Sequence, residues 1–229
     1  MTRILHASFY DRSTLTVALE LLGKVLVHRT GEGTTAGMIV ETEAYIGEDD
    51  PACHAAPGRT TRNAPLYGPP GVAYVYLNYG IHYLVNAVTE SAGHPAAVLI
   101  RALQPLDGVA LMRRRRGRDA ETRPEDLCRG PGNLTRAMGI GMTENLQVLS
   151  RGALTVEDRG CVFGEVSQGP RVGIRVGLDR PWRYWVEGHP AVSGPRLTSA
   201  TPTGAVGGAR ASRGTTRAHR RSGRAQVLR

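Results

Sequence analysis

Residues 72–88 strongly constrain the fold of this chain, because they predict a β-hairpin with an aromatic residue at its tip. The segment reads VAYVYLNYGIHYLVNAV, in which two runs rich in Val, Tyr and Leu flank Asn78–Tyr79–Gly80. Aromatic and β-branched residues favour strands, and Asn or Gly in the connection favours a tight turn. The fold must therefore contain antiparallel strands that a short turn joins.

The rest of the chain mixes strands and helices without the regular strand–helix–strand repeat of a parallel sheet. Strands are predicted at residues 24–29, 35–45, 96–105, 153–158, 171–176 and 181–187. Helices are predicted from Thr14 to a stop at Gly23, with Ser13 as cap, from residue 107 into an arginine-rich stretch, and at residues 130–140. A long polar loop, residues 47–71, separates strand 35–45 from the hairpin, and loops of this length are usually functional or disordered. This mixture predicts the α+β class.

Charge divides the chain into a predicted domain, residues 1–197, and a predicted tail, residues 198–229. The 229 residues are 41% hydrophobic, which suits one domain with a sizeable core. The tail has seven arginines, no acidic residue and almost nothing to bury, so most of the net charge of +9 lies there. This composition predicts a disordered, arginine-rich tail.

Several classes of protein are disfavoured by what the sequence lacks. It has no run of about 18 apolar residues, as a membrane-spanning helix requires. The N-terminal residues do not read as a signal peptide, so we expect a cytoplasmic protein without membrane contact. The three cysteines form no C-x-x-C pair, so neither a zinc site nor an iron–sulfur cluster is predicted.

Strand 35–45 carries the first candidate for chemistry. Regular alternation would place Met38, Val40, Thr42 and Ala44 on one face, and Glu41, Glu43 and Tyr45 on the other. A glutamate desolvated there would have a raised pKa, which suits a general base. Two alternatives stay open from the residues alone, a solvated strand edge and a metal site. The metal site would use Glu41, Glu43, Asp49 and His54, although their spacing matches no known ligand motif.

Other candidates lie in the long loop, the hairpin and strand 96–105. Tyr79 either packs back on the sheet or projects as a wedge into the minor groove of DNA, filling the space of an extruded base. Arg59 and Arg62 either bind phosphates or are simply solvated. Arg101 sits among apolar residues in mid-strand, so it needs a buried anionic partner, for which Glu43 is the natural candidate.

Several motifs, in order, resemble those of the alkyladenine (3-methyladenine) DNA glycosylases, the type without a helix-hairpin-helix motif. The motifs are LLGKVLV (21–27), VETEAY (40–45), HAAPGRTTRN (54–63), PPGVAYVYLNYGIHYLVN (69–86), VLIRALQP (98–105), LCRGPGNLTRAMGI (127–140) and GPRVGI (169–174). The resemblance extends from about residue 10 to residue 196. It implies one compact mixed domain with a curved antiparallel sheet, flanking helices and a protruding hairpin.

The resemblance also implies roles for individual residues. Glu43 would be the general base that holds the nucleophilic water, and Arg101 would help to position that water and Glu43. The main-chain carbonyl of Val172 would be a third contact of the water. Tyr45 and His54 would line the pocket and sandwich the flipped base with aromatic residues near Tyr76. Asn86 would discriminate against the guanine amino group, and Tyr79 would be the intercalating wedge. Arg59 and Arg62 remain the candidates for phosphate contacts.

The resemblance further implies a monofunctional DNA glycosylase that needs no metal or other cofactor. It would flip alkylated or deaminated purines, such as 3-methyladenine, hypoxanthine and ethenoadenine, out of double-stranded DNA and hydrolyse the N-glycosidic bond, initiating base excision repair. We expect a monomer associated with the nucleoid. A catalytically silent DNA-binding protein of the same fold is the alternative, and a metal-dependent hydrolase is a second one.

Overall fold

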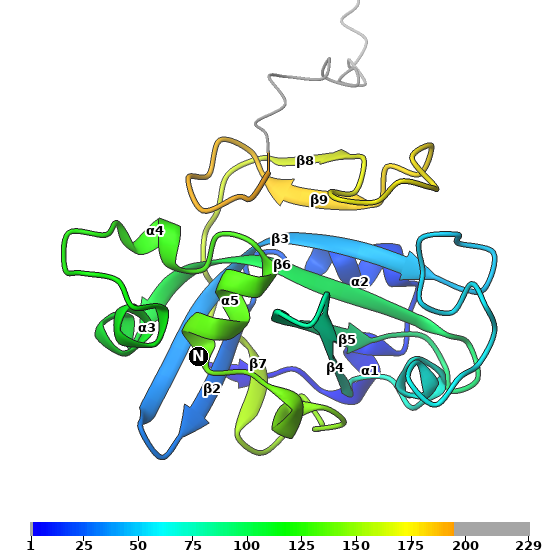
Figure 1. The fold of residues 1–229 in the computed structure, drawn as a ribbon, viewed down its shortest axis with the longest axis horizontal. Coiled ribbons are helices and arrows are strands. Elements are labelled where there is room, and N and C mark those ends of the chain that lie inside the picture. The colour runs from blue at the N-terminus through cyan, green and yellow to red at the C-terminus, as the bar shows by residue number, and fades with distance from the viewer. Residues whose placement is uncertain (1, 195–229) are drawn as a thin grey trace, which may run out of the picture. The chain divides into compact units, whose positions relative to one another are not determined.

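One antiparallel sheet organises residues 2–194, the part of the chain that the computed structural model describes (Figure 1). Within these residues the sheet has nine strands, with the order β1-β7-β2-β3-β6-β5-β4, and β9 adds to β3 and pairs with β8. The strands are β1 (Arg3–Ile4), β2 (Val25–Thr30), β3 (Gly33–Ile46), β4 (Ala73–Asn78), β5 (His82–Val88), β6 (Ala96–Asp107), β7 (Leu154–Asp158), β8 (Val166–Gly169) and β9 (Arg183–Val186). The predicted tail, residues 198–229, lies outside the described residues.

Short helices fill the connections between the strands. They are α1 (Ala7–Tyr10), α2 (Thr14–Glu20), α3 (Val109–Arg116), α4 (Pro124–Leu127) and α5 (Pro131–Met138), with 3-10 turns η1 (Ala64–Tyr67) and η2 (Met142–Glu144). The α+β class is thus confirmed. No helix among residues 2–194 is long and apolar enough to cross a bilayer.

The long strands β3 and β6 form the centre of the sheet, and the candidate residues lie on them or beside them. Most of their residues are buried, since α2 packs against both strands and α5 packs against β5 and β6. The β4–β5 hairpin and the β8–β9 hairpin lie on opposite sides of this central pair in Figure 1. The predicted hairpin at residues 72–88 is therefore confirmed.

A β-bulge corrects the predicted alternation of strand 35–45. In the pairing of β3 with β6, Ile39 is opposite Leu103 and Glu41 is opposite Ala102, so Val40 has no partner of its own. The extra residue leaves Val40 and Glu41 on the same face of the sheet. Met38 and Val40 accordingly pack in one hydrophobic cluster with Val186 of β9, and Glu41 also contacts β9 through Arg183.

The prediction was therefore wrong for Met38 and Val40, and the bulge is the reason. It was right for Thr42 and Ala44, which face the core beside α2. It was also right for Glu41, Glu43 and Tyr45, which the next subsection describes.

A second correction concerns the predicted strand 171–176, which is irregular in the structure. Gly173 has a φ of 79°, which an extended strand does not allow, and the N–H of Val172 binds a carboxylate instead of a neighbouring strand. The strand in this region is β8, which ends before the segment begins. The segment instead lines the cavity described below.

The first predicted helix differs in detail at its ends. Ser13 is the N-cap residue of α2, but its side chain makes no capping hydrogen bond. The carboxylate of Glu90 takes that role, since it accepts a bond from the Thr14 N–H at 3.1 Å. The helix ends at Glu20, before the predicted stop at Gly23.

Candidate active site

The Glu43 carboxylate is buried at the centre of the sheet, where β3, β6 and the segment after β8 meet. Its side chain has no exposed surface. Oε1 accepts a hydrogen bond from the Val172 N–H at 2.6 Å, and Oε2 accepts one from the Tyr45 hydroxyl at 2.8 Å. Oε2 also accepts one from Nη1 of Arg101 at 3.2 Å. Burial raises the pKa of Glu43 above its usual value, although these three donors act in the opposite direction.

Arg101 bridges the two glutamates of β3. Its Nε donates to Glu41 at 2.8 Å, Nη1 donates to Glu43, and Nη2 donates to the Ser193 hydroxyl at 3.1 Å. Glu41 is also held by Nε of Arg183 at 2.8 Å and by the N–H of Ser193. The ion pair of Arg101 with Glu43 that the sequence predicts is present, but Arg101 lies closer to Glu41.

A cavity of about 350 Å³ lies against this cluster. Glu43 does not line it, but all three of its donors do, namely Tyr45, Arg101 and Val172. The volume falls within the range of about 300–1,000 Å³ that is usual for ligand pockets. A carboxylate has about four acceptor positions, and three of those of Glu43 are used, so one acceptor position remains.

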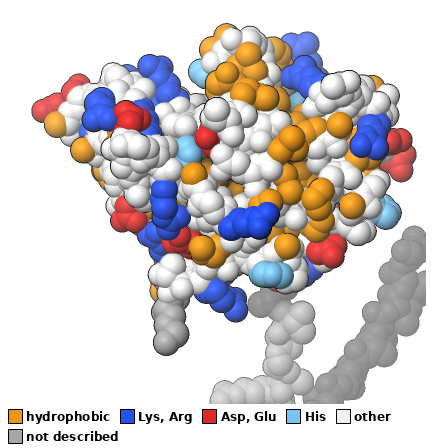
Figure 2. Space-filling view, turned by 90° about the horizontal axis from the view of Figure 1, so that it is seen from below, with side chains coloured by type: hydrophobic (Ala, Val, Ile, Leu, Met, Phe, Trp, Pro, Cys, Tyr) orange, Lys and Arg blue, Asp and Glu red, His pale blue; other side chains and the backbone are white. Residues whose placement is uncertain are grey.

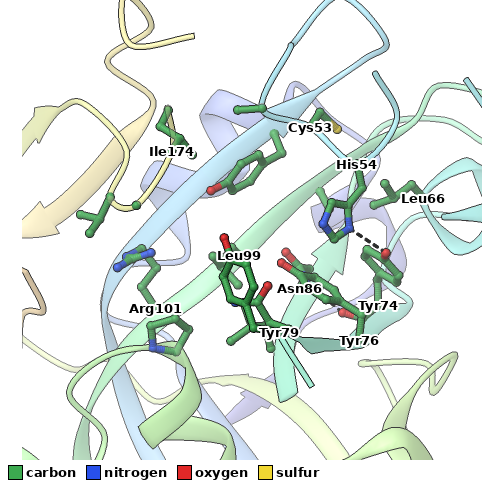
Figure 3. A pocket seen from close by; sticks show the side chains of 18 residues that line it. Cys53, His54, Leu66, Tyr74, Tyr76, Tyr79, Asn86, Leu99, Arg101 and Ile174 are labelled. Carbon is green, nitrogen blue, oxygen red and sulfur yellow. Dashed lines mark hydrogen bonds between the residues drawn. The ribbon is translucent and has the colours of Figure 1, made fainter. Parts of the chain in front are cut away.

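Aromatic side chains form the wall opposite Arg101 (Figure 3). His54 lies with its ring centroid 4.4 Å from that of Tyr76, and its Nδ1 is 2.9 Å from the Tyr74 hydroxyl. Burial, together with the nearby charge of Arg62, lowers the pKa of His54, so this imidazole is neutral at neutral pH. Asn86 lines the same cavity, and its amide donates to the carbonyl of Tyr74 at 3.0 Å. The cavity therefore suits a planar ring system with polar edges.

Tyr79 projects from the tip of the β4–β5 hairpin and does not pack back on the sheet. It is 89% exposed, and it also reaches the mouth of the cavity. Its φ of 48° and the φ of 70° at Gly80 make the tight turn. A large aromatic residue in this left-handed region is uncommon, and such strain is concentrated at functional sites.

The two loop arginines lie on the same side of the molecule as the aromatic wall. The guanidinium of Arg59 is 5.4 Å from the centroid of Tyr67, and that of Arg62 is 5.9 Å from the centroid of Tyr76. Both side chains are exposed. The face in Figure 2 mixes hydrophobic side chains with scattered basic and acidic ones.

Three of the four ligands proposed for the metal alternative are bonded to other partners. Glu41 and Glu43 are occupied by arginines, and His54 is bonded to Tyr74. Among residues 2–194, no group of three or more His, Cys, Asp or Glu side chains is arranged to hold a metal ion.

The sequence alone did not identify three residues of the site. Tyr74 is two residues before Tyr76 on β4, so strand alternation could have placed both on one face. Asp50 and Arg171 form a buried ion pair against Tyr45, and their separation of 121 residues left no local signal.

Comparison with known proteins places the chain among the DNA glycosylases, the hydrolases that cleave N-glycosyl bonds. The profile of the methylpurine-DNA glycosylase family matches residues 8–190, and the chain belongs to this family. Its substrate is therefore DNA.

The match with this chain covers nearly the whole length of each relative. A protein of Burkholderia lata is 47% identical over 195 residues, which are 84% of this chain and 92% of that protein. A protein of Rubrobacter xylanophilus is 50% identical over 182 residues, covering 79% and 93% of the two chains. A protein of Methanocella arvoryzae is 46% identical over 194 residues, covering 83% of this chain and 96% of that protein. All three are named, provisionally, as 3-methyladenine DNA glycosylases.

Proposed function

We propose that this enzyme removes 3-methyladenine and related alkylated or deaminated purines, including hypoxanthine and ethenoadenine, from double-stranded DNA. The observation that carries the proposal is the buried Glu43 carboxylate, whose donors form one wall of an aromatic cavity. The names of the relatives support 3-methyladenine as a substrate. The product would be an abasic site, which initiates base excision repair.

The target base must leave the helix to reach this cavity. Flipping a nucleotide costs a few kcal/mol, and the cost is lowest for a damaged or mismatched base. In our proposal Tyr79 enters the duplex where the base was, and its exposure at the hairpin tip supports this role. His54, Tyr76 and Tyr45 stack on the flipped base. Asn86 reads its edge and excludes the amino group of guanine.

Hydrolysis then needs one activated water. Cleavage of the N-glycosidic bond passes through a sugar with oxocarbenium character, and alkylation makes the base a better leaving group. We assign Glu43 as the general base, with its free acceptor position towards the water. The same carboxylate stabilises the cationic sugar. Arg101 and the carbonyl of Val172 would orient the water, a role additional to the bond from the Val172 N–H to Glu43.

The proposal includes a monofunctional enzyme that acts as a monomer at the nucleoid, in the cytoplasm. A lyase step would need an amine near the sugar. The only lysine in the sequence is Lys24, whose Nζ is 2.9 Å from Asp158, and neither residue lines the cavity. Arg59 and Arg62 are both exposed, and Arg62 lies against Tyr76 of the cavity wall, which supports contacts with the DNA phosphates.

A panel of duplex oligonucleotides tests the proposal. Each duplex carries one 3-methyladenine analogue, hypoxanthine or ethenoadenine, and is incubated with the enzyme in excess chelator before alkali cleaves any abasic site. We expect cleavage of the damaged strand only, and none in an undamaged duplex. Binding without base release would favour the catalytically silent alternative, and release that chelator abolishes would favour a metal-dependent one.

A further inference from the structure

Arg171 is completely buried and holds together four parts of the chain beside Glu43. Its guanidinium donates to both oxygens of Asp50, with Nη2 to Oδ1 at 2.8 Å, and Nη1 also donates to the carbonyl of Ala44 at 3.0 Å. The same guanidinium lies 4.6 Å from the ring centroid of Tyr45 and 5.2 Å from that of Trp182. Both side chains of the ion pair have no exposed surface.

The ring of Trp182 continues this arrangement outward. The guanidinium of Arg180 lies 4.8 Å from its centroid, so that aromatic rings and guanidinium groups alternate from the cavity wall to the surface. Guanidinium groups stack well on aromatic faces, and burial strengthens the attraction. Arg171 is thus fixed in position from both sides, as well as by Asp50.

The position of Arg171 gives the ion pair a consequence for Glu43. Val172 follows it directly in the chain, and Tyr45 lies against it. These two residues supply two of the three hydrogen bonds to the Glu43 carboxylate, one to each oxygen. A shift of the guanidinium would therefore move both donors at once.

A buried ion pair often adds little net stability to the segment that it holds. Desolvation of the two charges often outweighs their attraction, and apolar side chains of similar size frequently serve as well. Burial alone would raise the pKa of Asp50, but its bonds with Arg171 hold that pKa below the usual value, so the pair is ionised. The guanidinium of Arg171 is planar and charged, so it can stack on Tyr45 and also bind Asp50, which fixes the peptide of Val172. An apolar side chain could not make both interactions.

We propose that Asp50 and Arg171 are positioning residues that hold the Val172 N–H and the Tyr45 hydroxyl on Glu43 and so keep the base ionised. The inference rests on the proposed role of Glu43 as general base. Hydrogen bonds to a carboxylate favour its charged form, and burial opposes it. The charged and titratable groups around Glu43 are Arg101 from β6, Glu41 and Tyr45 from β3, Tyr76 from β4, Arg183 from β9, and Arg171.

The test compares the pH dependence of base release, under single-turnover conditions, in the wild type and the double variant Asp50→Asn/Arg171→Gln. Replacing both residues removes one positive and one negative charge, so the net charge near Glu43 is unchanged and no unpaired charge stays buried. We expect the acid limb of the rate profile to move to higher pH by about one unit, the size expected for weakened hydrogen bonds to a charged group. Affinity for lesion DNA should change by less than about threefold, because neither side chain is exposed.

Two further variants keep the test decisive. Arg171→Lys retains the charge opposite Asp50 and should fold, yet it loses the planar group, so it should shift the limb in the same direction. Lys24→Gln/Asp158→Asn removes an ion pair remote from the cavity and should leave the limb unchanged. A merely structural role would lower the active fraction without moving the limb.

The outcomes for the inference and for the proposed function are distinguishable. Should Glu43→Gln still release bases at close to the wild-type rate, the proposed role of Glu43 would be wrong. Should Glu43→Gln be inactive while Arg171→Lys and the double variant keep the wild-type acid limb, the positioning role would be overturned.

Discussion

Replacing Glu43 with glutamine separates its role in chemistry from its effect on stability. The amide keeps the shape of the side chain but cannot accept a proton. A general base contributes about 10²- to 10⁴-fold, so base release should fall by at least about 100-fold, equivalent to about 2.7 kcal/mol on the barrier. Binding to lesion DNA should persist, because Glu43 has no exposed surface.

The same variant should be more stable than the wild type at neutral pH. Burial raises the pKa of Glu43 in the folded state. A carboxyl group with a raised folded pKa stabilises the fold below its unfolded pKa, and this contribution is lost as the pH rises through the folded pKa. Above the raised folded pKa, the ionised Glu43 therefore costs stability, whereas glutamine is neutral at every pH.

The size of the effect follows from the linkage between protonation and folding. Each unit of pKa shift corresponds to about 1.4 kcal/mol. A gain of 1 kcal/mol raises the melting temperature by about 2–4 °C in a domain of this size. We expect a rise of a few degrees at pH 7 for each unit of pKa shift. This rise should shrink as the pH falls through the raised folded pKa and should be nearly gone below 4.5, the usual pKa of a glutamate.

Two measurements on the same preparations test this reasoning. Single-turnover base release gives the chemical effect, and thermal melts at pH 7 and pH 4 give the stability. Glu20→Gln, at an exposed ion pair on α2, is the matched control and should change neither. A Glu43→Gln variant that melts below the wild type at pH 7 would show that the carboxylate stabilises the fold, against the desolvation argument.

Three other predictions follow from the site and the sequence. Tyr79→Ala should slow excision from duplexes more than from single strands, and an equal loss on both substrates would argue against a wedge. Deletion of residues 198–229 should lower non-specific DNA affinity and flatten its salt dependence, because seven arginines are removed; unchanged affinity in a salt titration would contradict this. Borohydride should trap no covalent complex between enzyme and lesion duplex, and strands should stay intact until alkali is added, whereas a trapped complex would indicate a lyase.

The sequence predicted the elements that local pattern determines. Strands 24–29 and 96–105 and the hairpin at 72–88 all form, because runs of β-branched and aromatic residues between turn formers specify them. The pattern could not show the bulge at Val40. A bulge changes which face a residue occupies but leaves composition unchanged, so regular alternation placed Met38 and Val40 on the wrong face.

A site residue could be predicted where its own sequence neighbourhood is unusual for its chemistry. It could not be predicted where its role depends on contacts with residues far away in the chain. Arg101 in an apolar strand signalled a buried anion, and its ion pair with Glu43 is present. The partnership of Asp50 with Arg171 joins residues far apart in the chain, and nothing near either one indicates the other. The pattern of residues 171–176 even suggested a strand. In the structure the Val172 N–H instead binds the Glu43 carboxylate, and Arg171 binds Asp50 and the carbonyl of Ala44.

The two β3 glutamates, Glu41 and Glu43, have different surroundings. Glu41 contacts two guanidinium groups, from Arg101 and Arg183, and its remaining bond comes from a backbone N–H. Arg183 does not line the cavity, so Glu41 faces a charge-compensated interior. Glu43 contacts only one guanidinium group, that of Arg101, at the longer distance of 3.2 Å. All three of its hydrogen-bond donors border the cavity. Environments that differ in this way separate the functions of paired carboxylates. Glu41 therefore anchors Arg101, which supports our proposal that Glu43 is the carboxylate that takes a proton from water.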